Sequence, residues 1–421
     1  MSLAVVLALL LLSLIAGALV ILAALRLRGP GPCAAGASEA ACATCAACAD
    51  DLDLLAGADE DEPVAKLALR TIEDAYARGA ASVHVAPHEQ ATDGGPPGRV
   101  TRITYRVDGR LEGRMSLPAE ALRVLVARLR AMAGLQGRPR ALQRGRIDLR
   151  AHHPEAIDLV LDLATWRGHD GDHAVLHLLA RGTLALGLDA LDLHEDALAR
   201  VRAAATAPRG GVLLLAGEVE SGRTTTLHAL AHEVERDRRV AFVAPDPYVP
   251  WVEGVDPASV QSLDADVLVV GELRDAAAAR LAFAAAQEGR LVLATIFARD
   301  VGTAIARLVD DLQVSRHVLP ACLRAVVAQR LCRRVCRCRA DGAPPTACER
   351  CEGAGYKGRL GLHEVATVEG PLLAALRAGE TAPAALQAAA LAGGMTPLER
   401  DGARKAERGV TDLEAVRVAL A

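Results

Sequence analysis

The feature that most constrains this chain is a glycine-framed turn between an apolar segment and a helix-forming one. Residues 217–224 read Gly-Glu-Val-Glu-Ser-Gly-Arg-Thr and follow the wholly apolar run Val212–Ala216. Glycines at both ends allow a tight turn, and backbone N–H groups at the start of the next helix can then surround a phosphate group. The sequence predicts a buried strand, a phosphate-binding loop and a helix in succession. A strand-to-helix turn that binds no nucleotide is the alternative.

Residue 223 departs from the phosphate-loop pattern, because an arginine stands where the pattern has lysine. A planar guanidinium still binds phosphate but is bulkier than an ammonium group. The Thr224 hydroxyl is a candidate magnesium ligand, while Glu218 and Glu220 add negative charge where phosphates would bind. The residues predicted to bind nucleotide are Gly217, Glu218, Val219, Glu220, Ser221, Gly222, Arg223, Thr224 and Thr225, with Asp246 further along the chain.

The length and charge of the chain limit its class. Its 421 residues suffice for about two to three domains. The 48 basic and 52 acidic residues give a net charge of −4, and aromatic residues make up 2% of the chain. Nucleic-acid binding needs a basic field or stacking platforms, so this composition argues against it. Only Lys66, Lys357 and Lys405 are lysines, and the other basic residues are arginines. This preference for arginine suggests that a lysine is not strictly required at residue 223.

The first residues of the chain form an apolar stretch. Leu3–Leu25 carries no charge and consists almost wholly of Leu, Ala, Val and Ile, and a helix of this length spans the ~30 Å core of a bilayer. Arg26 and Arg28 follow it and no charge precedes it, which places the remaining domains in the cytoplasm. Residues 1–28 are therefore predicted to be a transmembrane anchor, making the chain a single-pass inner-membrane protein. A cleaved signal peptide is the alternative.

Residues 29–62 have the composition of a flexible, acidic linker. The linker also carries Cys33, Cys42, Cys45 and Cys48. Their C-x-x-C-x-x-C run is compatible with zinc or an iron–sulfur cluster. Incidental thiols on an alanine-rich tether are the alternative, so the sequence leaves the role of these cysteines open.

Residues 63–182 have the pattern of a smaller α+β domain. Apolar residues recur with helical spacing through Val64–Arg78 and Leu122–Leu135. Strands are predicted at Val83–Val85, Arg102–Arg106, Ile157–Leu163 and Ala174–Leu179.

Residues 183–421 instead alternate strands with helices. After a helix at Glu195–Ala205, strands are predicted at Val212–Ala216, Val240–Val243, Val267–Val270 and Leu291–Thr295. This alternation is typical of the α/β class with a doubly wound, mostly parallel sheet, which binds ligands at the carboxyl ends of its strands. The glycine-framed loop follows such an end.

A second motif places an acid at a strand end. Residues 266–275 read Asp-Val-Leu-Val-Val-Gly-Glu-Leu-Arg-Asp, an apolar strand that delivers Glu272 at its carboxyl end. An acid beside the phosphates can orient water or magnesium, so Glu272 is the candidate catalytic base. A strand-end carboxylate that merely pairs with Arg274 is the alternative.

Together, the loop and the strand-end acid resemble the traffic ATPases of type II secretion and type IV pilus assembly. The resemblance runs from Pro63 almost to the C-terminus and includes the segments Gly79–Val85, Arg106–Leu111, Gln143–Ile147 and Gly271–Asp275. It implies a RecA-like P-loop ATPase domain over residues 183–421, with ATP and Mg²⁺ bound between it and the α+β domain. It also implies a hexamer or a mixed ring that works with inner-membrane platform proteins of a secretion or pilus machine.

This family also carries a cysteine insertion near the end of its ATPase domain, ahead of a helical C-terminal region. Here Gln329-Arg330-Leu331 is followed by Cys336, Cys338, Cys348 and Cys351, within residues 332–356. Two close pairs separated by a short loop are typical of a closed structural zinc site. The first pair is one residue tighter than C-x-x-C, so Cys332 is an alternative ligand. A disulfide is another alternative, which a cytoplasmic location disfavours.

The catalytic positions depart from the family pattern. The segment Pro245–Val249 keeps Asp246 but lacks both glutamates that flank the family's aspartate. Residues that stand where the family has histidines or arginines are Arg290, Phe297, Val160 and His177. Loss of cationic groups can cost about 10³–10⁵ in the rate of phosphoryl transfer. The sequence thus predicts an ATP-binding member with weak or absent hydrolysis, and the alternative is a non-catalytic, zinc-stabilised scaffold or adaptor.

Overall fold

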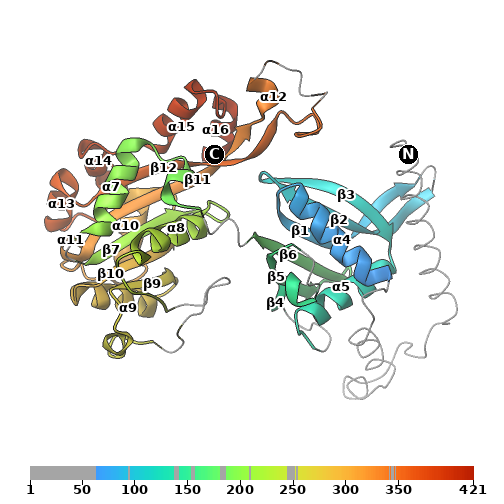
Figure 1. Ribbon diagram of the computed structural model, residues 1–421, viewed down its shortest axis with the longest axis horizontal. Helices are drawn as coiled ribbons and strands as arrows, with labels where there is room; N and C mark the ends of the chain where they lie inside the picture. Colours follow the sequence, from blue (N-terminus) through green and yellow to red (C-terminus); the bar gives the residue numbers. More distant parts are fainter. Residues whose placement is uncertain are drawn as a thin grey trace. The chain divides into compact units, whose positions relative to one another are not determined.

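The computed structural model divides into two compact units, one ending at Leu179 and the other beginning at Ala180 (Figure 1). It describes residues 63–92, 95–136, 142–152, 157–180, 186–207, 210–243, 252, 255–340, 342, 346 and 348–421. The predicted linker, its four cysteines Cys33, Cys42, Cys45 and Cys48, and Asp246 lie outside these residues.

The location predicted from the N-terminal stretch is wrong. Leu3–Leu25 itself lies outside the described residues. Among the residues that are described, no helix combines the length and apolar character that a membrane crossing requires. The longest of these helices, α4 (Pro63–Ala77), has 15 residues, whereas a span takes about 20. This finding overturns the assignment of the chain as a single-pass inner-membrane protein.

The first unit is an antiparallel sheet with the strand order β3-β2-β1-β6-β5-β4. Its strands are β1 (Ala80–Thr92), β2 (Gly95–Val107), β3 (Arg110–Pro118), β4 (Gln143–Asp148), β5 (Leu159–Arg167) and β6 (Asp172–Ala180). Its helices are α4, α5 (Ala121–Met132) and the short α6 (Leu149–His152). Helices α4 and α5 confirm the two helices predicted from the spacing of apolar residues. Strands β1, β2, β5 and β6 are longer than the strands predicted there.

Helices α4 and α5 pack together and against the sheet, where α4 contributes the buried residue Ile72 and the strands contribute Val83 and Ile103. The buried Tyr105 hydroxyl donates to the Thr71 carbonyl oxygen at 3.0 Å, which ties β2 to α4. Burial raises the pKa of Tyr105, an effect that the nearby Asp74 carboxylate reinforces. The phenol therefore stays protonated and keeps its donor.

The second unit contains a six-stranded sheet with the order β12-β11-β7-β10-β9-β8. Neighbouring strands are parallel except for β12, which is antiparallel to β11. The strands are β7 (Gly211–Gly217), β8 (Val240–Phe242), β9 (Val267–Glu272), β10 (Leu291–Phe297), β11 (Leu323–Val335) and β12 (Tyr356–Thr367). Of these, β7 to β10 match the four strands expected from the sequence.

The helices of this unit cover both faces of the sheet (Figure 1). They are η2 (Leu188–Leu191), α7 (Glu195–Thr206), α8 (Arg223–Glu235), η3 (Val260–Leu263), α9 (Ala276–Gln287), α10 (Val301–Asp310), α11 (Leu319–Cys322), α12 (Arg337–Ala340), α13 (Gly370–Arg377), α14 (Pro383–Ala392), α15 (Leu398–Glu407) and α16 (Leu413–Leu420). Leu213 and Leu215 of β7 face the core shared with α7 and α8, whereas Val212 and Leu214 face the core shared with α9 and α10. Because both faces are covered, β7 is apolar at every position.

A buried ion pair fastens α15 to β12. The Lys405 ammonium lies 2.6 Å from the Asp401 carboxylate and donates at 2.6 Å to the Gly361 carbonyl oxygen. Asp401 also accepts the His363 backbone N–H at 2.9 Å. Burial lowers the pKa of Lys405, although the Asp401 charge opposes this. Lys405 is one of only three lysines in the chain, and its side chain is 1% exposed.

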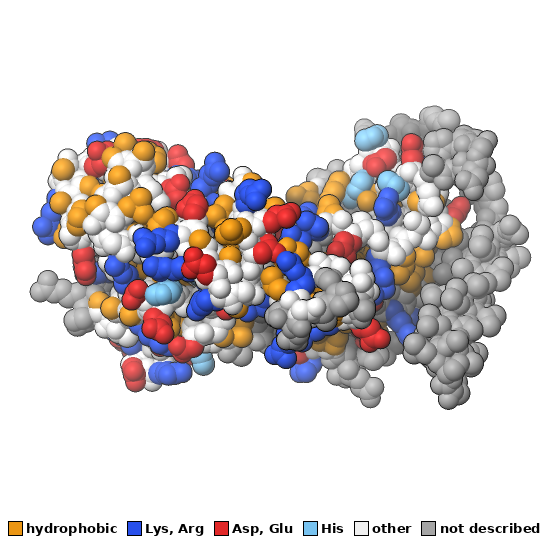
Figure 2. All heavy atoms as spheres, turned by 90° about the horizontal axis from the view of Figure 1, so that it is seen from above, with side chains coloured by type: hydrophobic (Ala, Val, Ile, Leu, Met, Phe, Trp, Pro, Cys, Tyr) orange, Lys and Arg blue, Asp and Glu red, His pale blue; other side chains and the backbone are white. Residues whose placement is uncertain are grey.

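On the described surface seen in Figure 2, basic and acidic side chains are interspersed rather than gathered into a field of one sign. This mixture reflects the near balance of 48 basic and 52 acidic residues. Local charge pairing, and not a global field, therefore governs the electrostatics of this chain.

We predict that a methyl group at Gly302 destabilises the second unit. A Cβ there would lie 2.1 Å from the Pro383 carbonyl oxygen, because α10 and α14 pack closely at this glycine. Gly302→Ala should therefore lower the free energy of unfolding by about 1–3 kcal/mol, the usual cost of overpacking. The measurement is chemical denaturation of the purified chain.

The matched control is Gly187→Ala, which makes the same chemical change where a Cβ would have no heavy atom within 4 Å. Its φ of −73° suits alanine. The control should shift stability by no more than about 0.5 kcal/mol. Equal effects of the two substitutions would contradict the close packing of α10 on α14.

Candidate phosphate loop and cysteine site

The glycine-framed turn lies at the carboxyl edge of the parallel sheet. β7 ends at Gly217, which is level with Phe297 of β10 and Gln329 of β11, and α8 begins at Arg223. A Cβ on Gly217 would lie 2.1 Å from Ser221 Oγ, so only glycine fits. Gly222 has φ +86°, in the left-handed region that favours glycine. Both glycines are thus required by the turn that opens the helix.

Two buried polar atoms beside the loop lack a hydrogen-bond partner in the part of the chain that the structure describes. They are Ser221 Oγ and Gln329 Oε1, on residues that are only 4% and 2% exposed. Gln329 Nε2 donates to the Ser221 carbonyl oxygen at 2.7 Å and so holds the loop to β11. A buried polar atom without a hydrogen-bond partner calls for an explanation, and a bound ligand, ion or water is one of them. They favour a loop built for a ligand over a plain strand-to-helix turn.

Arg223 does not point freely into the loop. Its Nη1 donates to Glu272 Oε1 at 3.2 Å, and its side chain is 15% exposed. Arg274 Nε donates to the other oxygen of the same carboxylate at 2.6 Å. Burial raises the pKa of Glu272, but the Arg274 hydrogen bond and the Arg223 charge outweigh it and hold that pKa below its usual value. The alternative of an ion pair with Arg274 is therefore realised, with Arg223 as a second partner.

The loop's own carboxylates are also paired. Glu218 Oε1 lies 3.3 Å from Arg330 Nη2 of β11 and 3.8 Å from Arg299 Nε. Glu220 Oε2 lies 4.0 Å from Arg359 Nη1 of β12. Sequence reasoning did not find Arg299, Arg330 and Arg359 as neighbours of the loop, because each comes from a segment that is distant from the loop in the sequence.

The other predicted site residues differ in their exposure to solvent. Val219 is 75% exposed at the tip of the loop, Thr224 is exposed and Thr225 is half-buried. An exposed Thr224 hydroxyl at the start of α8 suits a magnesium ligand. In the first unit, Val160 is buried in β5 while His177 is exposed on β6.

Four cysteines converge on one point between β11 and β12. The Sγ atoms of Cys336, Cys338, Cys348 and Cys351 all lie within 4.8 Å of one another. Cys336 and Cys348 are 4.0 Å apart, and Cys338 and Cys351 are 3.7 Å apart. Thiolates bound tetrahedrally to zinc at about 2.3 Å are about 3.8 Å apart, whereas a disulfide needs about 2.05 Å. The donor set fits zinc, and no disulfide joins the described cysteines.

Cys332, the alternative ligand, lies elsewhere. Its buried Sγ contacts Thr411 Oγ1 at 3.1 Å, and Thr411 in turn donates to the Arg333 carbonyl oxygen. Within the cluster, the backbone N–H of Cys351 lowers the pKa of Cys348 to about 7. A thiol that ionises near neutral pH is ready to bind a metal ion.

The cysteine cluster is joined to helix α16. The Tyr356 ring lies under the Arg333 guanidinium at 3.9 Å, and its hydroxyl donates to Asp412 Oδ2 at 2.5 Å. Arg339 donates to the same carboxylate at 3.0 Å. Asp412 also caps α16 by accepting the Ala415 N–H. These contacts make the cluster part of the folded unit rather than an independent loop.

The comparisons with known proteins agree with this geometry. The sequence profile of the family described as Type II/IV secretion system protein matches residues 57–418. The chain belongs to this family. Among the secretion system proteins it resembles, the Type II secretion system protein HxcR of Pseudomonas aeruginosa is 31% identical over 376 residues, which cover 84% of this chain and 76% of that one.

A pilus protein of the same family is also similar. The Type IV pilus assembly ATPase PilB of Thermus thermophilus is 29% identical over 396 residues. The match covers 85% of this chain but only 43% of the relative, so this chain spans less than half the length of that protein. Its matching part corresponds to both units described here.

The ATPase DotB of Legionella pneumophila, a solved structure, has a TM-score of 0.60 to this family member at 17% identity. The match covers 83% of this chain and 94% of DotB. A likeness at this identity concerns the fold alone. It confirms the predicted α/β P-loop ATPase fold.

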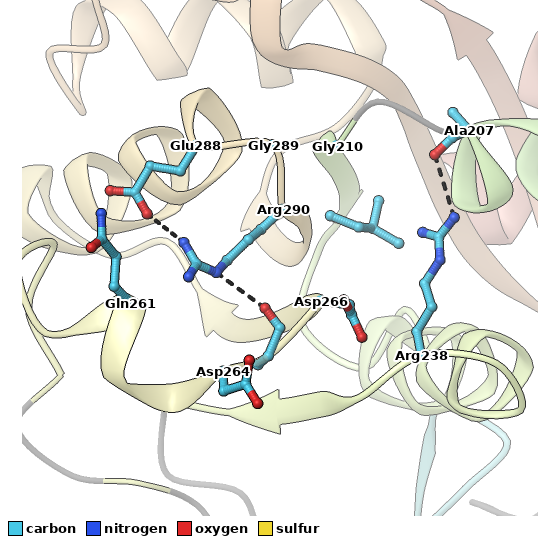
Figure 3. Close-up of a pocket in the computed structure, with 11 residues that line it drawn as sticks. Ala207, Gly210, Arg238, Gln261, Asp264, Asp266, Glu288, Gly289 and Arg290 are labelled. Atoms are coloured by element: carbon cyan, nitrogen blue, oxygen red, sulfur yellow. Dashed lines mark hydrogen bonds and ion pairs between the residues drawn. The ribbon is translucent and has the colours of Figure 1, made fainter.

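The second unit also has a hollow of about 600 Å³, at the edge of the sheet opposite the phosphate loop (Figure 3). It is lined by the amino ends of β7, β9 and β10, and β7 has 7 residues, so about 20 Å separate it from the loop. Arg290 points toward Glu288 and Arg238 toward Ala207, so both guanidinium groups already have partners. The hollow takes no part in the phosphate loop.

We predict that the four converging cysteines bind one zinc ion per chain. Cys348→Ser should remove about one equivalent of zinc relative to the wild type, since a tetrahedral thiolate site loses a ligand. It should also lower the melting temperature. Metal content of the purified protein by mass spectrometry is the measurement.

Cys332→Ser is the control, because it changes a buried thiol outside the cluster. It should leave the zinc content unchanged even where it lowers stability. Zinc loss from Cys332→Ser with retention in Cys348→Ser would reverse the assignment of the ligands.

Proposed function

We propose that this chain is an ATP-binding member of the secretion and pilus ATPase family that hydrolyses ATP weakly or not at all. The loop from Gly217 to Thr225 would hold the phosphates with its backbone N–H groups at the start of α8. The observation that carries nucleotide binding is the pair of orphaned polar atoms on Ser221 and Gln329 beside that loop. The relative named Type IV pilus assembly ATPase supports ATP as the nucleotide.

Weak hydrolysis follows from the state of Glu272. A general base must be free to accept a proton, and two arginines hold this carboxylate from both oxygens at 3.2 and 2.6 Å. Its lowered pKa makes it a weaker base still. Thr224 would ligate the Mg²⁺ that accompanies ATP, and the ion would neutralise phosphate charge. Glu272 in this arrangement fixes Arg223 in place rather than activating water.

The second candidate function is a non-catalytic scaffold or adaptor, and the cysteine cluster favours it. Its contacts through Tyr356 and Asp412 connect the cluster to α16 and stabilise the C-terminal region without any nucleotide. In this case ATP would not protect the chain against thermal unfolding.

The partners proposed for either function come from the family. They are the inner-membrane platform proteins of a secretion or pilus machine, and further copies of this chain or of an active relative. A hexamer or a mixed ring is the proposed assembly. Size measurement of the purified chain tests it, and a strict monomer at micromolar concentration would argue against a ring of this chain alone.

We predict that the wild type binds fluorescent ATP and that Glu272→Gln leaves phosphate release unchanged within about twofold, whereas loss of a working general base costs about 10²–10⁴-fold. The reason is that Glu272 is held by Arg223 and Arg274. Binding titration and a phosphate-release assay on the same preparation are the measurements. A large loss of turnover in Glu272→Gln would restore the enzyme interpretation.

Gly222→Ala is the loop-breaking variant for this experiment, because φ +86° strains alanine and the new Cβ would lie 3.1 Å from Gln329 Nε2. It should weaken ATP binding at least about tenfold, or about 1.4 kcal/mol. Gly409→Ala has similar backbone strain, at φ +73°, with no heavy atom within 4 Å of a Cβ. This control should bind ATP like the wild type.

A further inference from the structure

We infer that Arg330 is a phosphate-binding residue whose guanidinium is occupied by Glu218 until nucleotide arrives. This inference rests on the proposed nucleotide binding and adds a residue and a regulating contact to it. The Glu218 carboxylate acts as a built-in competitor for the anion that Arg330 is placed to hold. Binding of nucleotide therefore breaks the ion pair between Glu218 and Arg330.

Arg330 is positioned by the sheet rather than by the loop. It follows Gln329, which is level with Gly217 in the parallel pairing of β11 with β7. Its Nη1 donates to the Gln329 carbonyl oxygen at 3.1 Å, and its side chain is 10% exposed. A guanidinium held this firmly loses little side-chain entropy on binding an anion, and its fork geometry suits phosphate oxygens.

Among the described residues, the ion pairs around the loop involve more guanidinium groups than carboxylates. Five guanidinium groups pair there with three carboxylates. The guanidinium groups belong to Arg223, Arg274, Arg299, Arg330 and Arg359, and the carboxylates to Glu218, Glu220 and Glu272. Burial lowers the pKa of Arg223, and the nearby Arg274 and Arg330 charges lower it further, although the Glu272 charge opposes this. Such a cluster favours an added anion.

Glu218 is the carboxylate able to leave. Its side chain is 44% exposed, and its second partner, Arg299, is a long 3.8 Å away and 67% exposed. Glu272, by contrast, is fixed by two short contacts. Glu218 also follows Gly217 directly, at the point where the loop leaves β7. A phosphate at the loop can thus take the place of Glu218 on Arg330 while Arg223 stays with Glu272.

The test compares Glu218→Gln with Glu233→Gln in the full chain, since both remove one negative charge that pairs with an arginine, and Glu233 lies on α8 outside the loop. Glu218→Gln should tighten the binding of fluorescent ATP about tenfold, the effect of one charge-assisted contact. Inorganic triphosphate, which lacks base and ribose, should displace the probe with the same gain. Glu233→Gln, whose partner Arg202 is 2.9 Å away, should change binding less than about threefold.

A second pair of variants addresses the arginine itself. Arg330→Gln should weaken ATP binding about tenfold, and Arg202→Gln, which lies on α7 outside the loop, should weaken it less than about threefold. Because Arg330 is buried, circular dichroism must show that Arg330→Gln is folded, and the Glu218→Gln result stands without it. Equal gains from the two glutamate variants, or wild-type affinity in folded Arg330→Gln, overturn the inference while leaving the proposed function intact. If neither the wild type nor Glu218→Gln binds nucleotide, the proposed function and the inference both fail.

Discussion

Burial of strand β7 on both faces is the constraint on which the rest of the second unit depends. Its alternate residues face two separate cores that helices cover, and both of its neighbouring strands, β10 and β11, run parallel to it. Parallel neighbours bring their carboxyl ends to one edge. Gly217, Phe297 and Gln329 meet there for this reason, although they are far apart in the sequence. The site thus lies where the parallel pairing of β7 with β10 and β11 brings the ends of the strands together.

Replacement of the loop lysine by arginine has consequences beyond one position. A guanidinium is large enough to reach the carboxylate of Glu272 at the end of β9, and it does so at 3.2 Å. That contact pairs the cation of the loop with the candidate base, so each side chain already has an ionic partner. The remaining arginines near the loop come from β11, β12 and the segment after β10, and they pair with glutamates of the loop. The glutamates of the loop are therefore held by arginines from segments that are distant in the sequence.

The two candidate sites of the second unit share their supporting strands. β11 carries Gln329 and Arg330 past the phosphate loop and ends at Val335, directly before Cys336. β12 begins at Tyr356, which is joined to Asp412, and carries Arg359 back to the loop. A metal ion held by the four cysteines would fix the ends of both strands. The cluster and the loop are thus held by the same two strands.

The sequence by itself determined the local elements and the motifs. Continuous apolar runs predicted β7, β9 and β10, glycine spacing predicted the loop, and cysteine spacing indicated the cluster, because each depends on residues close along the chain. Tertiary structure alone decided which charges meet. Glu272 had an ion-pair alternative with Arg274 two residues away, but its contact with Arg223 spans 49 residues of sequence and follows from strand order. Arg330 was visible only as part of a marker before the cysteines, since a single polar residue within a buried strand gives no periodic signal. Spacing left Cys332 as a possible substitute for Cys338, and only the tertiary structure separates them, because it buries Cys332 against Thr411 and places Cys338 with its three partners.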